Sequence, residues 1–221
     1  VTLARSDDAE LAKRREKLEQ TLATRREEAG ARLRARVGDY LTAQLELKKY
    51  PEEGFDQILS PDDIIPASVR RWRDFLHLAA GPTHSIFGPW QALSGISETG
   101  FAEQAAGALK RALDVPGLNP LVAAAFAAPP ASAREAAARY GTLFVEAESL
   151  GDAAGADELR AFLRDPGSPT VVPDTGIVNN ETFFPTSATE ELWKLQGEVD
   201  RRLIELGAPA GAELAILAEE G

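Results

Sequence analysis

The fold is decided by residues 8–48, which read DAELAKRREKLEQTLATRREEAGARLRARVGDYLTAQLELK. Apolar residues recur in this stretch at spacings of seven and four, which places them on one stripe of a helix with charged residues around the rest. The stripe consists of Leu11, Leu18, Leu22, Ala29, Leu33, Val37, Leu41 and Leu45. No proline interrupts the chain before Pro51, so the pattern predicts one helix about 60 Å long. Ser6 or Asp7 is expected to cap its start, and Gly30 and Gly38 are its weak points.

A second long helix is predicted over residues 188–206. Ser187 and Glu190 have the spacing of a capping box, an apolar stripe runs from Leu192 to Leu206, and Gly207 follows as a C-terminal cap. Between the two long helices, caps and first-turn prolines divide the chain into short helices. Their core is expected to contain Trp72, Trp90, Leu93, Tyr140 and Phe144. The sequence therefore predicts an all-α fold with seven or eight helices. Val171-Val172 and Ile177-Val178 are compatible only with very short strands.

The domain organisation follows from composition. The 221 residues suit one helical domain with a charged helix or arm (1–50), a core of short helices and proline-rich loops (51–187), a long helix (188–207) and an exit segment (208–221). Within the exit segment, Leu214–Leu217 predicts a strand or a lead into whatever follows. The chain starts at Val1 and contains no methionine, so we expect a domain excised from a larger protein, although removal of a signal peptide would leave the same kind of N-terminus.

Charge and composition exclude several classes of function. The formal net charge is −11, and the basic residues of the first helix alternate with acidic ones, as on a solvated helix face. An acidic chain repels phosphate, so we expect no binding to nucleic acid. The absence of cysteine excludes disulfides, thiolate metal sites and covalent c-type haem. The longest uncharged stretch, Val115–Ser132, contains four prolines, so no membrane span is predicted.

Few residues are candidates for chemistry. The sequence has only two histidines and no His-x-x-x-His spacing, phosphate loop or Gly-x-Ser-x-Gly motif, so it predicts no catalytic residue, metal ligand or cofactor. His77 is expected at the edge of a buried helix face. If a site exists, its candidates are Asp62, Asp63, His84 and Trp193.

Each candidate also has a structural interpretation. The adjacent carboxylates Asp62 and Asp63 are typical of a turn or helix cap, and His84 of a loop residue that bonds the backbone. Trp193 flanks an apolar stripe, which suits a sugar-stacking platform, the edge of the core or an interface.

Four stretches carry a resemblance to a known family. They are PASVRRW (66–72) with Phe75-Leu76, HSIFGPWQAL (84–93), ARYGTLF (138–144), and Leu159-Arg160 through PGSP (166–169). Together they resemble the middle region of the large planctomycete proteins that carry a cytochrome-c-like domain and two conserved domains of unknown function. In that family this region lies between the two domains and has no assigned activity. The resemblance implies flanking domains as partners and an extracytoplasmic location, periplasmic or exported. The family's haem attachment needs two cysteines and a histidine, so no haem residue carries over to this chain.

Two functions remain open from the sequence. The first is a non-catalytic helical spacer or docking domain within a larger exported multidomain protein. The alternative is part of an enzyme or binding module acting on carbohydrate or another extracellular substrate. A pocket lined by Asp62, Asp63, His84 and an exposed tryptophan favours the alternative, whereas full burial of Trp72 and Trp90 with the carboxylates scattered favours the spacer. The oligomeric state stays open.

The two long helices are expected to pack against each other, because neither apolar stripe is stable in water. Such packing brings the two ends of the domain together. We expect the Leu33–Leu45 half of the first helix to be buried within the domain. The Leu11–Leu22 half is expected to be more exposed, lying against Leu192–Leu206 or a flanking domain.

Overall fold

The computed structural model of the chain describes residues 8–51, 60 and 62–207. Over these residues the protein is all-α, with ten α-helices, three short 3-10 turns and no strand. The helices are α2 (Ala9–Ala35), α3 (Val37–Gln44), α4 (Pro66–Leu78), α5 (Gly88–Ser94), α6 (Phe101–Leu113), α7 (Pro120–Ala125), α8 (Ala133–Ala147), α9 (Ala156–Arg164), α10 (Ile177–Asn180) and α11 (Thr186–Glu205). The 3-10 turns are η1 (Leu47–Lys49), η2 (Glu98–Gly100) and η3 (Glu181–Phe183).

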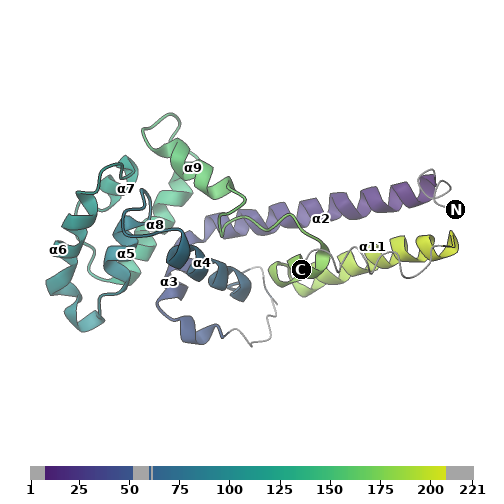
Figure 1. Cartoon of the computed structure of the whole chain (residues 1–221), viewed down its shortest axis with the longest axis horizontal. Helices are drawn as coiled ribbons and strands as arrows, with labels where there is room; N and C mark the ends of the chain where they lie inside the picture. The colour runs from purple at the N-terminus through teal and green to yellow at the C-terminus, as the bar shows by residue number, and fades with distance from the viewer. Residues whose placement is uncertain (1–7, 52–59, 61, 208–221) are drawn as a thin grey trace.

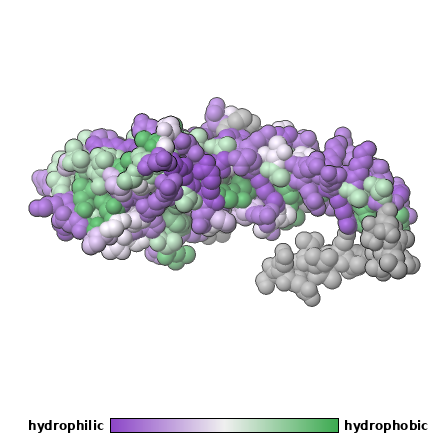
Figure 2. Space-filling model, turned by 90° about the horizontal axis from the view of Figure 1, so that it is seen from above, coloured by the Kyte–Doolittle hydropathy of each residue, from purple (hydrophilic) through white to green (hydrophobic). Residues whose placement is uncertain are grey.

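These elements form a head and a stalk (Figure 1). Helices α3 to α9 gather into the head, whereas α2 and α11 extend from it as an antiparallel pair. The first turn of α2 and the last turn of α11 lie together at the far tip of the stalk. Hydrophilic residues cover most of the stalk face that Figure 2 shows. The predicted packing of the two long helices is thus confirmed.

The first apolar stripe folds as two helices instead of one. Arg36 leaves helical geometry, with φ −122° and ψ 26°, and separates α2 from α3. The physical reason lies at Gly38, where α3 crosses α8. A Cβ built on Gly38 falls 2.9 Å from the carbonyl oxygen of Ala137 and 3.0 Å from the Cα of Gly141, so the two backbones are in direct contact. This close crossing sets a direction for α3 that differs from that of α2, and the prediction of a single helix over 8–48 is wrong.

A short helix also forms where strands were considered. Ile177 and Val178 open α10, with Ile177 buried and Val178 exposed. One turn of helix buries one of two adjacent apolar residues without needing a strand partner. Together with the break at Arg36, α10 raises the number of α-helices in the described residues above the predicted seven or eight.

The predicted core residues of the head are all buried: Trp72, Trp90, Leu93, Tyr140 and Phe144. The rings of Trp72, Tyr140 and Phe144 pack around Phe87, which stacks on Tyr140 at 5.5 Å between centroids and meets Trp72 edge-on at 5.6 Å. The Tyr140 hydroxyl donates to the carbonyl oxygen of Ile86 (2.7 Å), so its polar tip is satisfied inside the core. Burial raises the pKa of Tyr140. These rings form the aromatic centre of the head.

The stalk has an apolar cluster of its own at the tip. Leu11 packs there with Val199 and Leu203, and Leu18 and Leu206 lie against them. Leu11 is only 2% exposed, because α11 extends far enough to cover it. The expectation that the whole Leu11–Leu22 half is the more exposed one is therefore wrong at Leu11. Leu18 and Leu22 are partly buried.

Some helix ends follow the sequence signals and others do not: α4, for example, begins at Pro66, so the cap that the sequence predicts at Ser68 is wrong. Asp8 caps α2 by accepting from the Leu11 N–H (2.7 Å), whereas Ser6 and Asp7 lie outside the described residues. Helix α11 begins at Thr186 after Pro185, so the cap predicted at Ser187 is wrong. Gly207 ends α11 with φ +74°, the left-handed conformation expected after a helix C-terminus. Leu214–Leu217 and the rest of the exit segment lie outside the described residues.

Candidate functional site

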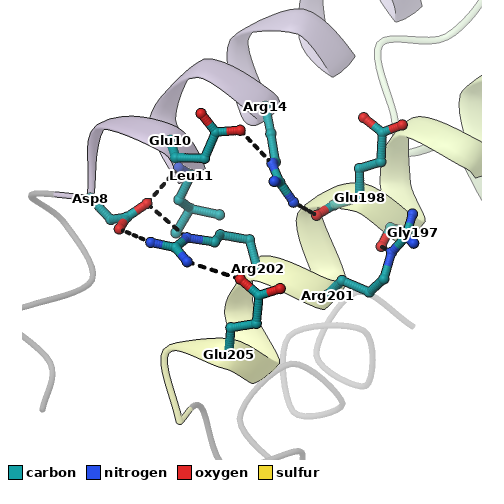
Figure 3. Close-up of polar contacts among 9 residues, drawn as sticks. All are labelled: Asp8, Glu10, Leu11, Arg14, Gly197, Glu198, Arg201, Arg202 and Glu205. Atoms are coloured by element: carbon teal, nitrogen blue, oxygen red, sulfur yellow. Dashed lines mark hydrogen bonds and ion pairs between the residues drawn. The ribbon is translucent and has the colours of Figure 1, made fainter.

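A cluster of charged side chains closes the tip of the stalk (Figure 3). The Arg202 guanidinium of α11 donates to both carboxylate oxygens of Asp8, at 2.6 and 3.1 Å, and to Glu205 at 2.9 Å. Arg14 of α2 donates to Glu10 (2.9 Å) and to the carbonyl oxygen of Glu198 (2.9 Å). The hydrogen bonds from Arg202 and from the Leu11 N–H hold the pKa of Asp8 below its usual range. A bidentate pair is directional, so the cluster fixes how the ends of α2 and α11 meet.

Asp62 and Asp63 form a turn ahead of α4. The Asp63 side chain accepts from the Ser60 N–H (2.8 Å), and the Asp63 N–H donates to the Ser60 carbonyl oxygen (3.1 Å), so the two residues close the turn. The main-chain carbonyls of Asp62 and Asp63 accept from the Arg36 guanidinium at 2.6 and 3.2 Å. The pair therefore braces the break between α2 and α3.

His84 serves the backbone of the loop before α5. Its Nδ1 accepts from the N–H groups of Ile86 (3.1 Å) and Phe87 (3.3 Å). Its ring lies 5.5 Å from the Phe87 ring and 6.0 Å from the Phe75 ring, centroid to centroid. Burial lowers the pKa of His84, and the nearby Glu158 opposes this shift. The neutral imidazole is thus the form that fits.

Trp193 lies on the outer side of the stalk, 42% exposed. Its indole N–H donates to a carboxylate oxygen of Glu181 (2.9 Å), which connects α11 to η3. The four candidates from the sequence lie in three places: Asp62 and Asp63 in the turn before α4, His84 in the loop before α5, and Trp193 on α11. None of them lines the groove of the head, a hollow between the ends of α3, α4, α5 and α8.

That groove, about 850 Å³ in volume, opens on the head between the ends of α3, α4, α5 and α8. Its residues include Gln44–Leu47, Arg73, Leu76, His77, Gly81, Pro82, Trp90, Gln91, Ser94–Ile96, Glu98, Phe101 and Ala131–Arg134. The buried members Leu76, Trp90 and Phe101 are apolar, whereas His77 and Glu98 are exposed. Gln91 donates to the carbonyls of Leu76 (2.6 Å) and Ala80 (2.7 Å) and so closes the C-terminal end of α4. The groove therefore combines apolar and charged lining residues, as small-molecule sites do.

Glu46, at one side of the groove, is paired with two cations, Arg134 in the groove lining and Lys49 next to it. Its carboxylate accepts from Lys49 (2.6 Å) and from Arg134, two cations on one anion. The hydrogen bonds from Lys49 and Arg134 hold the pKa of Glu46 below its usual range, so it is ionised at neutral pH. Arg73 pairs with its neighbour Asp74 (2.8 Å).

Sequence patterns gave no signal for this groove. Glu46 and Arg134 are 88 positions apart and belong to no motif. His77, expected at the edge of a buried face, is the one histidine that lines it. Arg71 was also missed: its half-buried guanidinium donates to the Ser168 carbonyl (3.0 Å) and to that of Val171. Arg71 lies beside the apolar stripe of α4 and not on it, so helical periodicity gives no signal for its contacts.

Within residues 8–51, 60 and 62–207, no three histidine or acidic side chains gather as a metal site requires. None of the helices in this part of the chain combines the length and apolar character needed to cross a membrane.

No protein-family model, curated protein or solved structure matches the chain.

Proposed function

We propose that this protein is a non-catalytic helical spacer or docking domain of a larger exported multidomain protein. Its stalk would hold the segments that precede and follow it at one point, and its head would stand away from that point. The flanking domains of a parent protein would be its partners, and its location would be extracytoplasmic. The multidomain nature of the parent protein and its location are what the resemblance to the planctomycete proteins implies.

The observation that carries the proposal is the closed tip of the stalk. Asp8 and Arg202 lie 194 positions apart in the chain, and their side chains are in bidentate contact. Leu11, Val199 and Leu203 pack directly behind them. Whatever is attached before residue 8 and after residue 207 therefore leaves the domain from the same place.

The roles of the candidate residues support the same function. Asp62, Asp63 and His84 are engaged in turns and caps, and Trp72 and Trp90 are buried. The exposed candidate, Trp193, bonds Glu181 on η3 and is not joined to Asp62, Asp63 or His84 by any described contact, so the candidates do not gather into one site. We therefore favour the spacer over the carbohydrate-active alternative.

The test is a distance measured across the tip. The chain has no cysteine, so spin labels can be attached at Lys13→Cys and Gly197→Cys alone. We expect a short and narrow distance distribution, which broadens in Arg202→Glu because like charges then face each other at Asp8. Arg201→Glu is the matched control, since Arg201 donates to the carbonyl of Gly197 on its own helix.

The same variants test the function when two folded reporter domains are fused to the ends of the chain. Energy transfer between the reporters should fall in Arg202→Glu and stay unchanged in Arg201→Glu. Transfer that is insensitive to Arg202→Glu, while the spin labels show an open tip, would reject the spacer role.

A further inference from the structure

The groove of the head has features of a binding site that the spacer function does not use. Its buried residues Leu76, Trp90 and Phe101 come from three helices, α4, α5 and α6. Leu45, Leu47 and Ile96, also among its lining residues, are only partly buried. Its volume of about 850 Å³ is within the range that holds a small organic molecule. Apolar side chains in an open groove gain free energy when an apolar ligand displaces water from them.

Beside the groove, cations outnumber carboxylates at Glu46. At Glu46, two cations share one carboxylate, because Lys49 and Arg134 both donate to it. The trio therefore carries a net positive charge. Half of the Arg134 side chain and two thirds of the Lys49 side chain are exposed, so both have room to accept a second anion. A guanidinium has five N–H donors, and the Arg134 guanidinium donates to Glu46 through one nitrogen, Nη2.

We propose that this groove binds an amphipathic carboxylate, a molecule with an aliphatic or aromatic body and one anionic head group. The body lies along Leu76, Trp90 and Phe101. The head group is held by Arg134, with Lys49 beside it. This proposal does not rest on the spacer function, because the groove is in the head whereas the proposed attachment point is at the tip of the stalk.

The proposal is tested with three probes that share one alkyl chain: decanoate, 1-decanol and decyltrimethylammonium. Isothermal titration calorimetry on the full chain, below the concentrations at which the probes self-associate, should show saturable binding of decanoate. Its affinity should exceed that of the alcohol by about tenfold, because one charge-assisted hydrogen bond contributes roughly this factor. The cationic probe should bind more weakly than either.

Two variants at one ion pair should change decanoate affinity in opposite directions. Arg134→Gln removes the cation and should lower decanoate affinity about tenfold, to the level of the alcohol. Glu46→Gln removes the competing anion and should raise it. Neither should alter binding of 1-decanol. Arg15→Gln, an exposed arginine on the stalk helix α2, is the control for charge alone. If Arg134→Gln fails to fold, the rise in Glu46→Gln still decides.

A third variant tests whether the ligand binds in the groove. Gly95 lines the groove with φ −85°, and a Cβ built on it meets no described atom within 4 Å. Gly95→Trp should therefore fold normally, fill the groove and abolish binding of decanoate and decanol alike. Absence of saturable decanoate binding, equal affinity for the three probes, or binding unaffected by Gly95→Trp would each overturn the proposal. Preference for the cationic probe would overturn it in favour of Glu98 as the anchoring group.

Discussion

The His84 imidazole caps the loop before α5 by accepting hydrogen bonds from the backbone. Two backbone N–H groups, those of Ile86 and Phe87, point at Nδ1, so this nitrogen has to be free of a proton. Protonation puts a hydrogen where the two donors converge and charges a ring packed between Phe75 and Phe87. The acidic group that faces it, Glu158 of α9, favours the charged form but does not outweigh burial.

We expect this cap to make stability depend on pH. Burial lowers the pKa of His84 below its ordinary 6.5. Between the lowered pKa of the folded protein and 6.5, the unfolded chain therefore binds more protons than the folded one. The free energy of unfolding should therefore fall as the pH drops from 7.5 through 6.5 and below. Urea melts at several pH values measure this. His84→Asn, which keeps an acceptor but does not titrate, should remove this part of the slope, and His77→Asn should not.

The carboxylates do not obscure this prediction. Asp8, Glu46 and Glu135 also have lowered pKa values, but their ordinary values are 3.8 to 4.5. Their contribution is lost only as the pH falls through that lower range. A slope above pH 5.5 that survives in His84→Asn would show that another group is responsible.

Among the elements, the crossing of α3 over α8 depends on two glycines. Gly38→Ala should lower the free energy of unfolding by about 1–3 kcal/mol, because its methyl group meets backbone atoms at 2.9 and 3.0 Å. Gly197→Ala on α11 is the matched control: its methyl group meets no described atom within 4 Å, and alanine favours the helix. That variant should raise stability by up to about 1 kcal/mol. Urea melts that rank the two variants the other way would contradict the close crossing.

Much of the element list was predictable, and its exceptions have a common cause. Apolar periodicity and caps such as Ser132 with Glu135 act within one or two turns, so the sequence alone indicates them. The break at Arg36 depends on Gly141, about a hundred positions away, and periodicity continues undisturbed across it. The groove depends on Glu46 meeting Arg134 in the same way. Local patterns do not carry such long-range contacts.

At the scale of the whole molecule, head and stalk should differ in how they lose structure. Leu41 is fully buried in the head cluster, so Leu41→Ala should cost about 2–5 kcal/mol of global stability. Leu11 is also buried, but its apolar cluster at the tip holds only four other residues. Leu11→Ala should therefore open the tip locally and change global stability less.

Hydrogen exchange separates the two effects. In Leu11→Ala, amides of the first turns of α2 and the last turns of α11 should exchange faster, with the head unchanged. In Leu41→Ala, protection should fall across the head. Uniform loss of protection in both variants would mean that head and stalk unfold as one unit.

The antiparallel stalk also determines how the domain responds to mechanical force. Tension applied through residues 8 and 207 pulls α2 and α11 apart from their shared tip, so contacts between them break in sequence and not all at once. The Asp8–Arg202 pair is first in that sequence, followed by the cluster at Leu11. The aromatic centre of the head carries no load until the stalk has opened. We therefore expect stretching of a single molecule to extend it first at low force, by parting the helices, and then at a higher force when the head ruptures. The stalk would thus act as an extensible element that yields before the head does.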